Sequence, residues 1–418
     1  MKILVCHNYY KLRGGEDQCF EDEIAQLESN GHTVIPYIRN NDSIDRSNQL
    51  AVALSTAWNR KSYREMRGLL REHKPDVLHC TNTLPLVSPS VYYAAEVEST
   101  PVVQALHNFR LVCPDAFLCR DSKVCEKCLT KKFAWPAIKH KCYRGSRAGS
   151  FAVSSMLATH RLMGTWKKKI HLYYTLTEFS KSKLLHLGIQ PDRIAVKPNC
   201  VHPDPGVGQG DQDFALFVGR LSEEKGIYAL IDAWKSHNPN ITLKIVGDGP
   251  LTEVVRAAAD SNPQIELLGR KPFTEVLSLM GQAKVVVVPS VFYETFGRTI
   301  IEAYSSGTPV VASRIGAMQE LILPGETGYF FEPGNSEDLM AKVKTVLSDE
   351  AARQKMRTAA RLEFETKFTF GHNFQKLLDI YDQAIVNAGY DESRIAEIQR
   401  SKADKLKAAG LQTSKSLA

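Results

Sequence analysis

Apolar residues follow two alternating patterns along the first half of this chain. Short runs rich in Val, Ile and Leu predict buried strands, and they fall at residues 2–6, 33–37, 76–79 and 101–106. After the first run, Phe20, Ile24 and Leu27 recur at helical spacing, and Gly31 follows them as a helix-ending residue. Strands that alternate with helices in this way predict a parallel sheet covered by helices on both faces.

The same alternation starts again after a linker. Residues 202–212 are rich in Pro, Gly and Asp, which indicates an irregular connection. New apolar runs follow at residues 214–218, 242–246, 265–268, 285–288 and 309–312. The sequence therefore predicts an α/β protein in which two tandem Rossmann-like domains face each other across a cleft.

We place the domain boundaries by these shifts in pattern. Residues 1–200 form the predicted N-terminal domain and residues 201–370 the C-terminal domain. Residues 371–418 comprise an amphipathic helix, expected to pack back toward the N-terminal domain, and a polar, Lys-rich tail. Residues 108–147 break the alternation and indicate an insertion rich in Cys, Lys and aromatic residues.

Length and composition narrow the class of protein. A chain of 418 residues, 43% hydrophobic and 24% charged, is typical of a two-domain globular protein. No stretch approaches the ~20 apolar residues of a membrane span, and the first residues lack a signal-peptide pattern. We expect a cytoplasmic location. The net charge of +7 is concentrated at residues 131–147 and 167–169, which suit either an anionic membrane or a solvated basic face, and we expect no nucleic-acid partner.

The segment Glu294-Thr-Phe-Gly-Arg-Thr-Ile-Ile-Glu302 carries the strongest functional signal. It lies between two apolar runs, so its two glutamates are expected at the carboxyl edge of the second sheet, where open α/β sheets bind ligands. Two acceptors with backbone amides between them suit a ligand that carries both hydroxyls and phosphates. The alternative is a solvated helix with ordinary surface glutamates.

Two glycine-bearing loops follow strands of the same half. In the first, Arg220 and Lys225 stand five residues apart, and two cations there could hold a diphosphate without a metal ion. In the second, Gly247 and Gly249 allow a tight turn close to a ligand, although they also fit an ordinary strand-to-helix connection.

The first half offers weaker signals at its own strand ends. Gly14 and Gly15 open a helix and suit a phosphate or an acceptor molecule at the helix N-terminus. His107 ends the run 101–106 and could bond a sugar hydroxyl, or simply be a satisfied buried histidine. Asn108 and Arg110 follow it and are expected on the acceptor side.

Taken together, these motifs resemble the family 4 glycosyltransferases. The resemblance rests on Gly219-Arg220 with Lys225-Gly226, on Val246-Gly-Asp-Gly249 and on the Glu294–Glu302 segment, and it spans residues 1–385. It implies the two-domain GT-B architecture and a retaining, metal-independent transfer from a nucleotide-diphosphate sugar. The chain departs from the family's usual Pro-Asn-Gly at Lys197-Pro-Asn-Cys200, which puts the backbone angle at the hinge in doubt.

The resemblance also implies roles for single residues. Arg220 and Lys225 would neutralise the diphosphate, Glu302 would hold the ribose hydroxyls, and Glu294 would meet the donor sugar, which His107 faces. The donor would further be lined by Gly14, Gly15, Gly247, Gly249, Arg270, Phe296, Gly297, Arg298 and Thr299. The predicted catalytic set is therefore His107, Glu294, Arg220 and Lys225, with no metal.

The predicted function is transfer from a UDP- or GDP-sugar to a glycan or lipid-linked acceptor, in cell-surface polysaccharide or glycolipid synthesis, at the inner face of the membrane. No cofactor is required. Two alternatives stay open. One is a nucleotide-sugar epimerase or phosphorylase on the same architecture, and the other is an inactive scaffold that binds sugar nucleotides.

The insertion holds five of the nine cysteines. Cys113, Cys125, Cys128 and Cys142 are the best four for a structural zinc site, because Cys-x-x-Cys plus two thiols can supply tetrahedral coordination. The spacing of the second pair is loose, so reduced cysteines packed in a loop are the favoured alternative.

Overall fold

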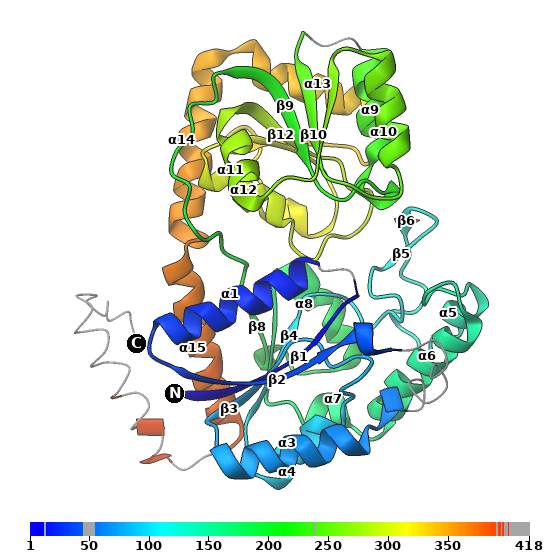
Figure 1. Cartoon of the computed structure of the whole chain (residues 1–418), viewed down its shortest axis with the longest axis vertical. Helices are drawn as coiled ribbons and strands as arrows, with labels where there is room; N and C mark the ends of the chain where they lie inside the picture. The colour runs from blue at the N-terminus through cyan, green and yellow to red at the C-terminus, as the bar shows by residue number, and fades with distance from the viewer. Residues whose placement is uncertain are drawn as a thin grey trace.

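The computed structural model describes residues 1–11, 14–44, 55–237 and 240–389, together with 392, 393, 395, 396 and 400. It forms two α/β lobes, one above the other in Figure 1. Most of the polar tail predicted at the C-terminus lies outside the described residues. The predicted fold class is confirmed, because each lobe contains a six-stranded parallel sheet with helices against it.

The lower lobe contains the first sheet, in the order β2-β1-β3-β4-β7-β8. Its strands are β1 (Lys2–Tyr9), β2 (Thr33–Asn40), β3 (Val77–Cys80), β4 (Val102–Leu106), β7 (Leu172–Thr175) and β8 (Ile194–Val196). Its helices are α1 (Gly15–Ser29), α3 (Arg60–His73), α4 (Ser90–Val97), α6 (Arg147–Leu162), α7 (Thr165–Lys168) and α8 (Glu178–Leu184). Short 3-10 turns cover Asn41–Ser43, Leu185–Leu187 and Pro191–Arg193.

The insertion predicted at residues 108–147 contains little regular structure. It holds a two-stranded hairpin of β5 (Cys119–Arg120) and β6 (Lys123–Val124), followed by the short helix α5 (Trp135–Lys139). In Figure 1 the hairpin rises from the lower lobe beside the upper one. This position places the insertion between the two domains.

The upper lobe contains the second sheet, in the order β11-β10-β9-β12-β13-β14. Its strands are β9 (Gln212–Val218), β10 (Thr242–Val246), β11 (Ile265–Gly269), β12 (Ala283–Val288), β13 (Val310–Ser313) and β14 (Gly328–Phe331). Its helices are α9 (Ile227–Ser236), α10 (Thr252–Ser261), α11 (Phe273–Gln282), α12 (Arg298–Ser305), α13 (Ser336–Ser348) and α14 (Glu350–Lys367), with 3-10 turns at Glu223–Lys225 and Gly316–Glu320.

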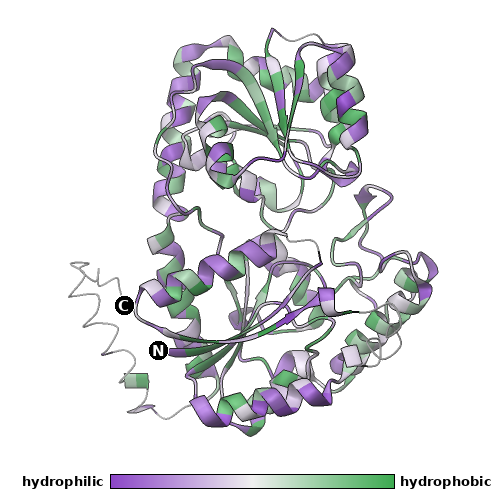
Figure 2. Ribbon diagram, viewed as in Figure 1, coloured by the Kyte–Doolittle hydropathy of each residue, from purple (hydrophilic) through white to green (hydrophobic). Residues whose placement is uncertain are grey.

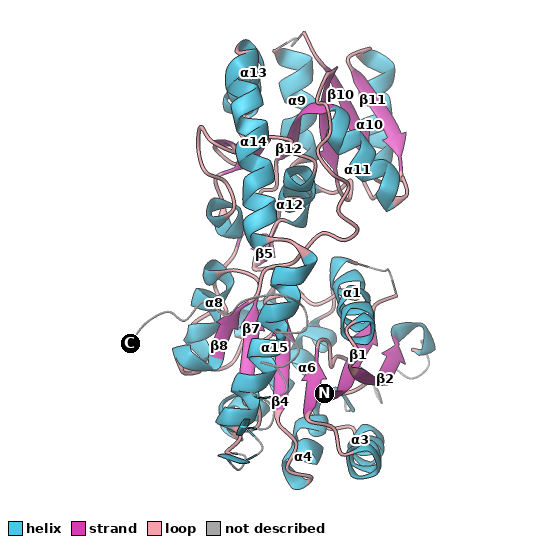
Figure 3. Cartoon of the chain, turned by 90° about the vertical axis from the view of Figure 1, so that its left-hand side faces the viewer, coloured by secondary structure: helices cyan, strands magenta, loops and turns pink. Residues whose placement is uncertain are grey.

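The last described helix returns to the first lobe. Helix α15 (Phe370–Asn387) follows α14 and packs Leu377, Tyr381 and Ile385 against the buried face of the first sheet. Figure 3 shows α14 beside the upper lobe and α15 beside the strands of the lower one. The amphipathic pattern therefore predicted this packing, because the apolar stripe of α15 covers a face of the sheet that would otherwise be exposed to solvent.

Burial follows the alternation seen in the sequence. Figure 2 shows apolar residues concentrated on the strands and the inner helix faces of both lobes, and the central strands β3, β4 and β13 are buried along their whole lengths. None of the helices in the described part of the chain is both long enough and apolar enough to cross a membrane.

Two local expectations need correction. Gln212 belongs to strand β9 rather than to the linker, because that strand begins two residues before its apolar run. Cys200 raises no conformational problem at the hinge, since it is not among the residues with positive φ.

Candidate functional site

The second sheet reverses its strand order between β9 and β12. The loops that follow these two neighbouring strands therefore lie at the edge where open α/β sheets bind ligands. The loop after β9 carries Arg220 and Lys225, and the loop after β12 carries Glu294. The structure therefore brings these predicted residues to one edge.

Lys225 and Glu294 form the centre of this edge. The Lys225 Nζ lies 2.6 Å from Glu294 Oε1, and the Ser290 hydroxyl donates to the same oxygen at 2.7 Å. Both charged side chains keep partial access to solvent, at 27% and 15% exposure. Arg220 and Arg270 are exposed and make no ion pair within the described residues, so their guanidinium groups are accessible to an anion.

Gly247 and Gly249 allow two loops to approach each other closely. Gly247 has a φ of 141°, and a Cβ there would come within 1.9 Å of the Gly219 carbonyl oxygen. At Gly249 the nearest atom, the Leu221 carbonyl oxygen, would be 2.5 Å away. These two glycines let the loop after β10 pack directly on the loop that carries Arg220 and Lys225.

Arg298 connects the second predicted glutamate to the other lobe. Its Nε donates to Glu302 Oε1 at 2.8 Å, and its Nη2 lies 3.3 Å from Asp22 Oδ2 on α1. Glu302 is nearly buried, and burial raises the pKa of its carboxyl group against the opposing effect of Arg298. The resemblance placed Arg298 among the residues that line the donor and did not predict this side-chain bridge between the lobes.

The segment around Arg298 is otherwise built into the core. Gly297 caps α12 with a φ of 101°, which favours glycine, and Thr299 lies in the first turn of that helix. The Phe296 side chain is 3% exposed and packs against Phe368. Only backbone atoms of Phe296 remain for the predicted contact with a ligand.

His107 lies at the end of β4, where the two lobes touch. The Thr295 hydroxyl of the upper lobe donates to the His107 carbonyl oxygen at 3.0 Å. The imidazole is buried, its Nε2 makes no hydrogen bond within the described residues, and burial lowers its pKa to about 4. The ring is therefore neutral near pH 7, with one buried nitrogen that has no hydrogen-bond partner among the described residues.

The remaining first-half residues form a second cluster beside His107. Gly14 caps α1 and Gly15 begins it, and the next residue, Glu16, accepts bonds from the Tyr10 hydroxyl and from Asn108 Nδ2, each at 3.0 Å. Burial raises the pKa of Glu16. A cavity of about 40 Å³ behind this cluster is lined in part by His107, Asn108 and Arg110. Glu16 was missed by the sequence analysis, although it directly follows the two glycines.

A buried network of charged and polar side chains lies next to His107. Glu23 on α1 accepts from Lys197 Nζ at 2.6 Å and from the Tyr174 hydroxyl at 2.9 Å, and Tyr174 also contacts His79 at 3.2 Å. The Tyr174 ring meets the His107 ring edge-on, with 6.1 Å between centroids. One signal was available in the sequence, because Glu23 interrupts the apolar stripe formed by Phe20, Ile24 and Leu27.

The cysteines of the insertion are all free thiols. Cys113 is buried, and Cys125, Cys128 and Cys142 are half-buried. Within the described part of the chain, no three His, Cys, Asp or Glu side chains are placed to hold a metal ion. The thiols therefore give no support to the zinc site considered from their spacing.

Comparison with known proteins identifies the upper lobe. Residues 204–363 match the family described as glycosyl transferases group 1. An uncharacterized glycosyltransferase of Methanocaldococcus jannaschii is 34% identical over 194 residues, which cover 46% of this chain and 54% of that protein. A glycogen synthase of Mycobacterium tuberculosis is 36% identical over 159 residues, 37% of this chain and 38% of that protein. In sequence, this chain matches about half the length, or less, of these two curated relatives.

Solved structures match across both lobes. A glycosyltransferase from Rickettsia africae superposes with a TM-score of 0.67 at 18% identity, covering 92% of this chain and 98% of that one. The Anabaena protein HepE, solved in complex with UDP, gives 0.66 at 19% identity, covering 91% and 99%. These likenesses establish the shared two-lobed fold, and the resemblance drawn from the motifs is confirmed.

Proposed function

We propose that this chain, whose residues 204–363 match the glycosyl transferases of group 1, moves a sugar from a nucleotide-diphosphate sugar to an acceptor hydroxyl. The observation that carries the proposal is the Lys225–Glu294 contact at the point where the second sheet reverses its strand order. When a nucleotide sugar binds there, the Lys225 ammonium can bind its phosphates and the Glu294 carboxylate can bind its sugar.

In this proposal the diphosphate replaces Glu294 as the partner of Lys225. Departure of a nucleoside diphosphate builds up negative charge, and Lys225 with the accessible Arg220 supplies positive charge in advance, which makes a metal ion unnecessary. Glu294 is then free to accept bonds from the sugar hydroxyls. Glu302, held by Arg298, is the acceptor for the ribose hydroxyls.

We further propose that transfer proceeds with retention. Support for retention comes from the motif resemblance. Same-face attack by the acceptor hydroxyl forms the new glycosidic bond as the bond to the diphosphate breaks, and the hydroxyl proton passes to the leaving phosphate, so this route needs no covalent nucleophile from the protein. His107 is neutral because of its lowered pKa, and its unpartnered Nε2 suits a sugar hydroxyl rather than a phosphate.

UDP-sugars are the preferred donor class in this proposal. Support comes from the UDP, UDP–glucose and UDP-with-glucose complexes of HepE, whose fold this chain shares. A GDP-sugar is the second candidate, since no residue described here distinguishes the two bases.

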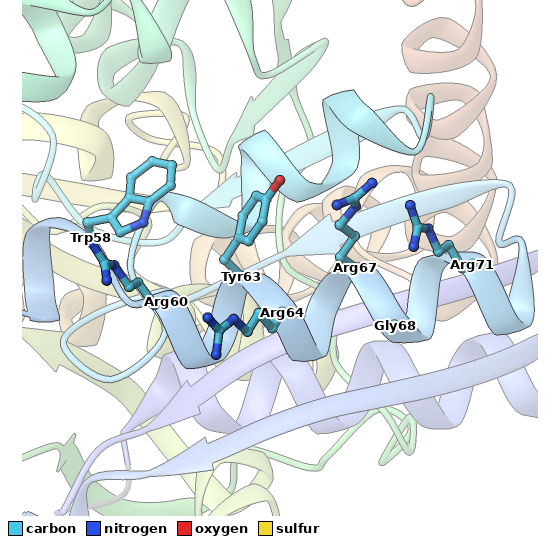
Figure 4. A pocket seen from close by; sticks show the side chains of 7 residues that line it. All are labelled: Trp58, Arg60, Tyr63, Arg64, Arg67, Gly68 and Arg71. Atoms are coloured by element: carbon cyan, nitrogen blue, oxygen red, sulfur yellow. The ribbon is translucent and has the colours of Figure 1, made fainter.

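The acceptor side is proposed to be a glycan or lipid-linked molecule in cell-surface polysaccharide or glycolipid synthesis, met at the inner face of the membrane. Support comes from a surface hollow of about 640 Å³ on α3 of the lower lobe, lined by four arginines with Trp58 and Tyr63 (Figure 4). The arginines are Arg60, Arg64, Arg67 and Arg71. Basic and aromatic groups together favour an anionic bilayer surface.

Vesicle sedimentation tests this membrane contact. Arg60→Glu with Arg64→Glu should weaken binding to vesicles of equal parts phosphatidylglycerol and phosphatidylcholine by about thirty-fold or more. Lys355→Glu with Arg256→Glu changes the net charge equally on exposed residues of the upper lobe and should have little effect. Equal losses in both double variants would contradict a specific surface.

Turnover of a UDP-sugar tests the proposed reaction itself. Lys225→Ala should reduce transfer by ~2–4 kcal/mol of lost transition-state stabilisation, while Lys235→Ala, an exposed lysine on α9 of the same domain, should not. A Lys225→Ala enzyme with full activity would contradict the role of this ammonium. Epimerisation of the donor sugar without an acceptor would instead support an epimerase. A requirement for inorganic phosphate would support a phosphorylase, and nucleotide binding without turnover would support a scaffold.

A further inference from the structure

Four residues in and around the β5–β6 hairpin of the insertion between the two lobes have a left-handed backbone. Ala116, Leu118, Asp121 and Ser122 all have positive φ, at 75°, 47°, 51° and 54°. Asp121 and Ser122 form the two-residue turn of the β5–β6 hairpin, where positive φ at both positions is the usual geometry. Ala116 and Leu118 flank Phe117, and residues other than glycine seldom adopt this conformation outside such turns, so the surrounding structure must offset its cost in free energy.

Contacts within the lower lobe hold the strained residues in place. The Phe109 amide donates to the Ala116 carbonyl oxygen at 3.0 Å, and the Cys125 amide donates to the Leu118 carbonyl oxygen at 2.8 Å. The Leu118 side chain is fully buried. The backbone on both sides of Phe117 is thus anchored, while the Phe117 side chain itself remains 51% exposed.

Phe117 points this exposed ring at the other lobe. Its centroid lies 6.2 Å from that of Phe292, which belongs to the loop after β12 and is only 6% exposed. The Lys225 Nζ lies over the same Phe292 ring, 5.2 Å from its centroid. The Val291 amide donates to the Glu224 carbonyl oxygen at 2.9 Å and ties the two loops together.

The hairpin turn contacts the same loop at a second point. The Ser122 hydroxyl donates to Glu223 Oε2 at 2.7 Å. Glu223 begins the 3-10 turn that ends at Lys225. The insertion of the lower lobe therefore meets the loops that carry Lys225 and Phe292 both through an aromatic pair and through a hydrogen bond.

We infer that Phe117 and Ser122 are positioning residues, through which the acceptor-side domain fixes the place of the Lys225 ammonium. A lysine side chain has many rotamers, and the Phe292 ring limits them only while the ring is itself held. Phe117 covers that ring, and Ser122 fixes the turn from which Lys225 projects. The inference rests on the proposed function for the ligand of Lys225, but the arrangement itself can be measured without a ligand.

The first measurement needs no nucleotide. The protein is treated with limiting acetic anhydride, and acetylation of Lys225 is followed by mass spectrometry, with Lys235 as the internal reference. Phe117→Ala should raise the relative labelling of Lys225 several-fold, because a freed ammonium is more accessible. Phe151→Ala is the matched control, since Phe151 is 52% exposed on α6. Equal Lys225 labelling in wild type and Phe117→Ala would overturn the inference.

The second measurement compares UDP with UMP by calorimetry in EDTA. Phe117→Ala should weaken UDP binding about five- to tenfold and leave UMP binding unchanged, because only UDP has the second phosphate for Lys225. Ser122→Ala should show the same preference more weakly, and Phe117→Tyr should behave as wild type. Equal weakening of UDP and UMP would indicate a general structural loss and contradict the inference. A wild type that binds neither nucleotide would count against the proposed donor, and the labelling result would still decide the positioning role.

Discussion

The buried Lys197–Glu23 pair offers a sharp test of how the lower lobe is held together. Lys197 Nζ and Glu23 Oε1 are 2.6 Å apart, with side-chain exposures of 2% and 7%. Burial is the largest single effect and would raise the pKa of Glu23, but Lys197, His79 and His107 together lower that pKa to about 2. Lys197→Met keeps most of the side-chain volume and removes the charge, so it leaves a buried carboxylate without its cation.

We expect Lys197→Met to lower the unfolding free energy of the lower lobe by ~3–5 kcal/mol at neutral pH, the usual cost of breaking a buried ion pair. Adding Glu23→Gln should recover part of this loss, because no unpaired charge then remains. Native-state hydrogen exchange of the amides in β7 and β8 measures this lobe separately from the upper one.

The pH dependence adds a second check on the same variant. Without Lys197 the pKa of Glu23 should rise above its unfolded value, so the penalty is present at neutral pH and fades as the pH falls toward the unfolded pKa. The deficit relative to wild type should therefore be smaller at about pH 5 than at about pH 7.5. A loss below ~1 kcal/mol, or a double variant no better than the single one, would refute the reasoning.

Three further predictions concern other parts of the molecule. Gly226→Ala should destabilise the upper lobe strongly in a thermal-unfolding scan, since φ is 73° and a Cβ would lie 1.8 Å from the Pro289 carbonyl oxygen; Gly389→Ala, with φ of 78° and open space around it, should cost only the strain. Arg298→Met should weaken binding of a nucleoside more than that of inorganic pyrophosphate, because it releases Glu302 but leaves the diphosphate loop intact; equal effects in calorimetry would contradict this. Acid should reduce the melting temperature as the pH falls from about 6.5 toward 4, because buried histidines must stay neutral in the fold and charge on unfolding; a flat profile would contradict it. Burial lowers the pKa to about 4 in His79, His107 and His171.

Periodicity predicted the two sheets because their central strands are buried on both faces. Runs such as 285–288 admit no polar residue at any position, so the pattern is unambiguous. Strand ends were less well predicted, since β2 continues through Ile38, Arg39 and Asn40, which are exposed or half-exposed and need only backbone pairing with β1. The short strand β14 was missed, although Tyr329, Phe330 and Phe331 form an aromatic run typical of strands, because the strand spans only four residues after a turn.

The candidate site was predictable where it depends on loops that follow adjacent strands. Lys225 and Glu294 could be placed at one edge because β9 and β12 each end in a motif-bearing loop. Contacts between the lobes could not be predicted in this way. Arg298 with Asp22, and Phe117 with Phe292, join residues whose proximity depends on how the two domains sit together, and local pattern contains no information about that.

Nucleotide-dependent thermal stabilisation in EDTA tests the central claim most directly. Wild-type protein is compared with Lys225→Ala in the presence of UDP, GDP, ADP, dTDP and their sugars. We predict that the nucleotides of one base, most of all UDP and its sugars, raise the melting temperature of the wild type without a metal ion. Lys225→Ala should lose most of that increase in melting temperature. No stabilisation by any diphosphate, or an equal shift in the variant, would contradict a metal-independent donor site built on Lys225.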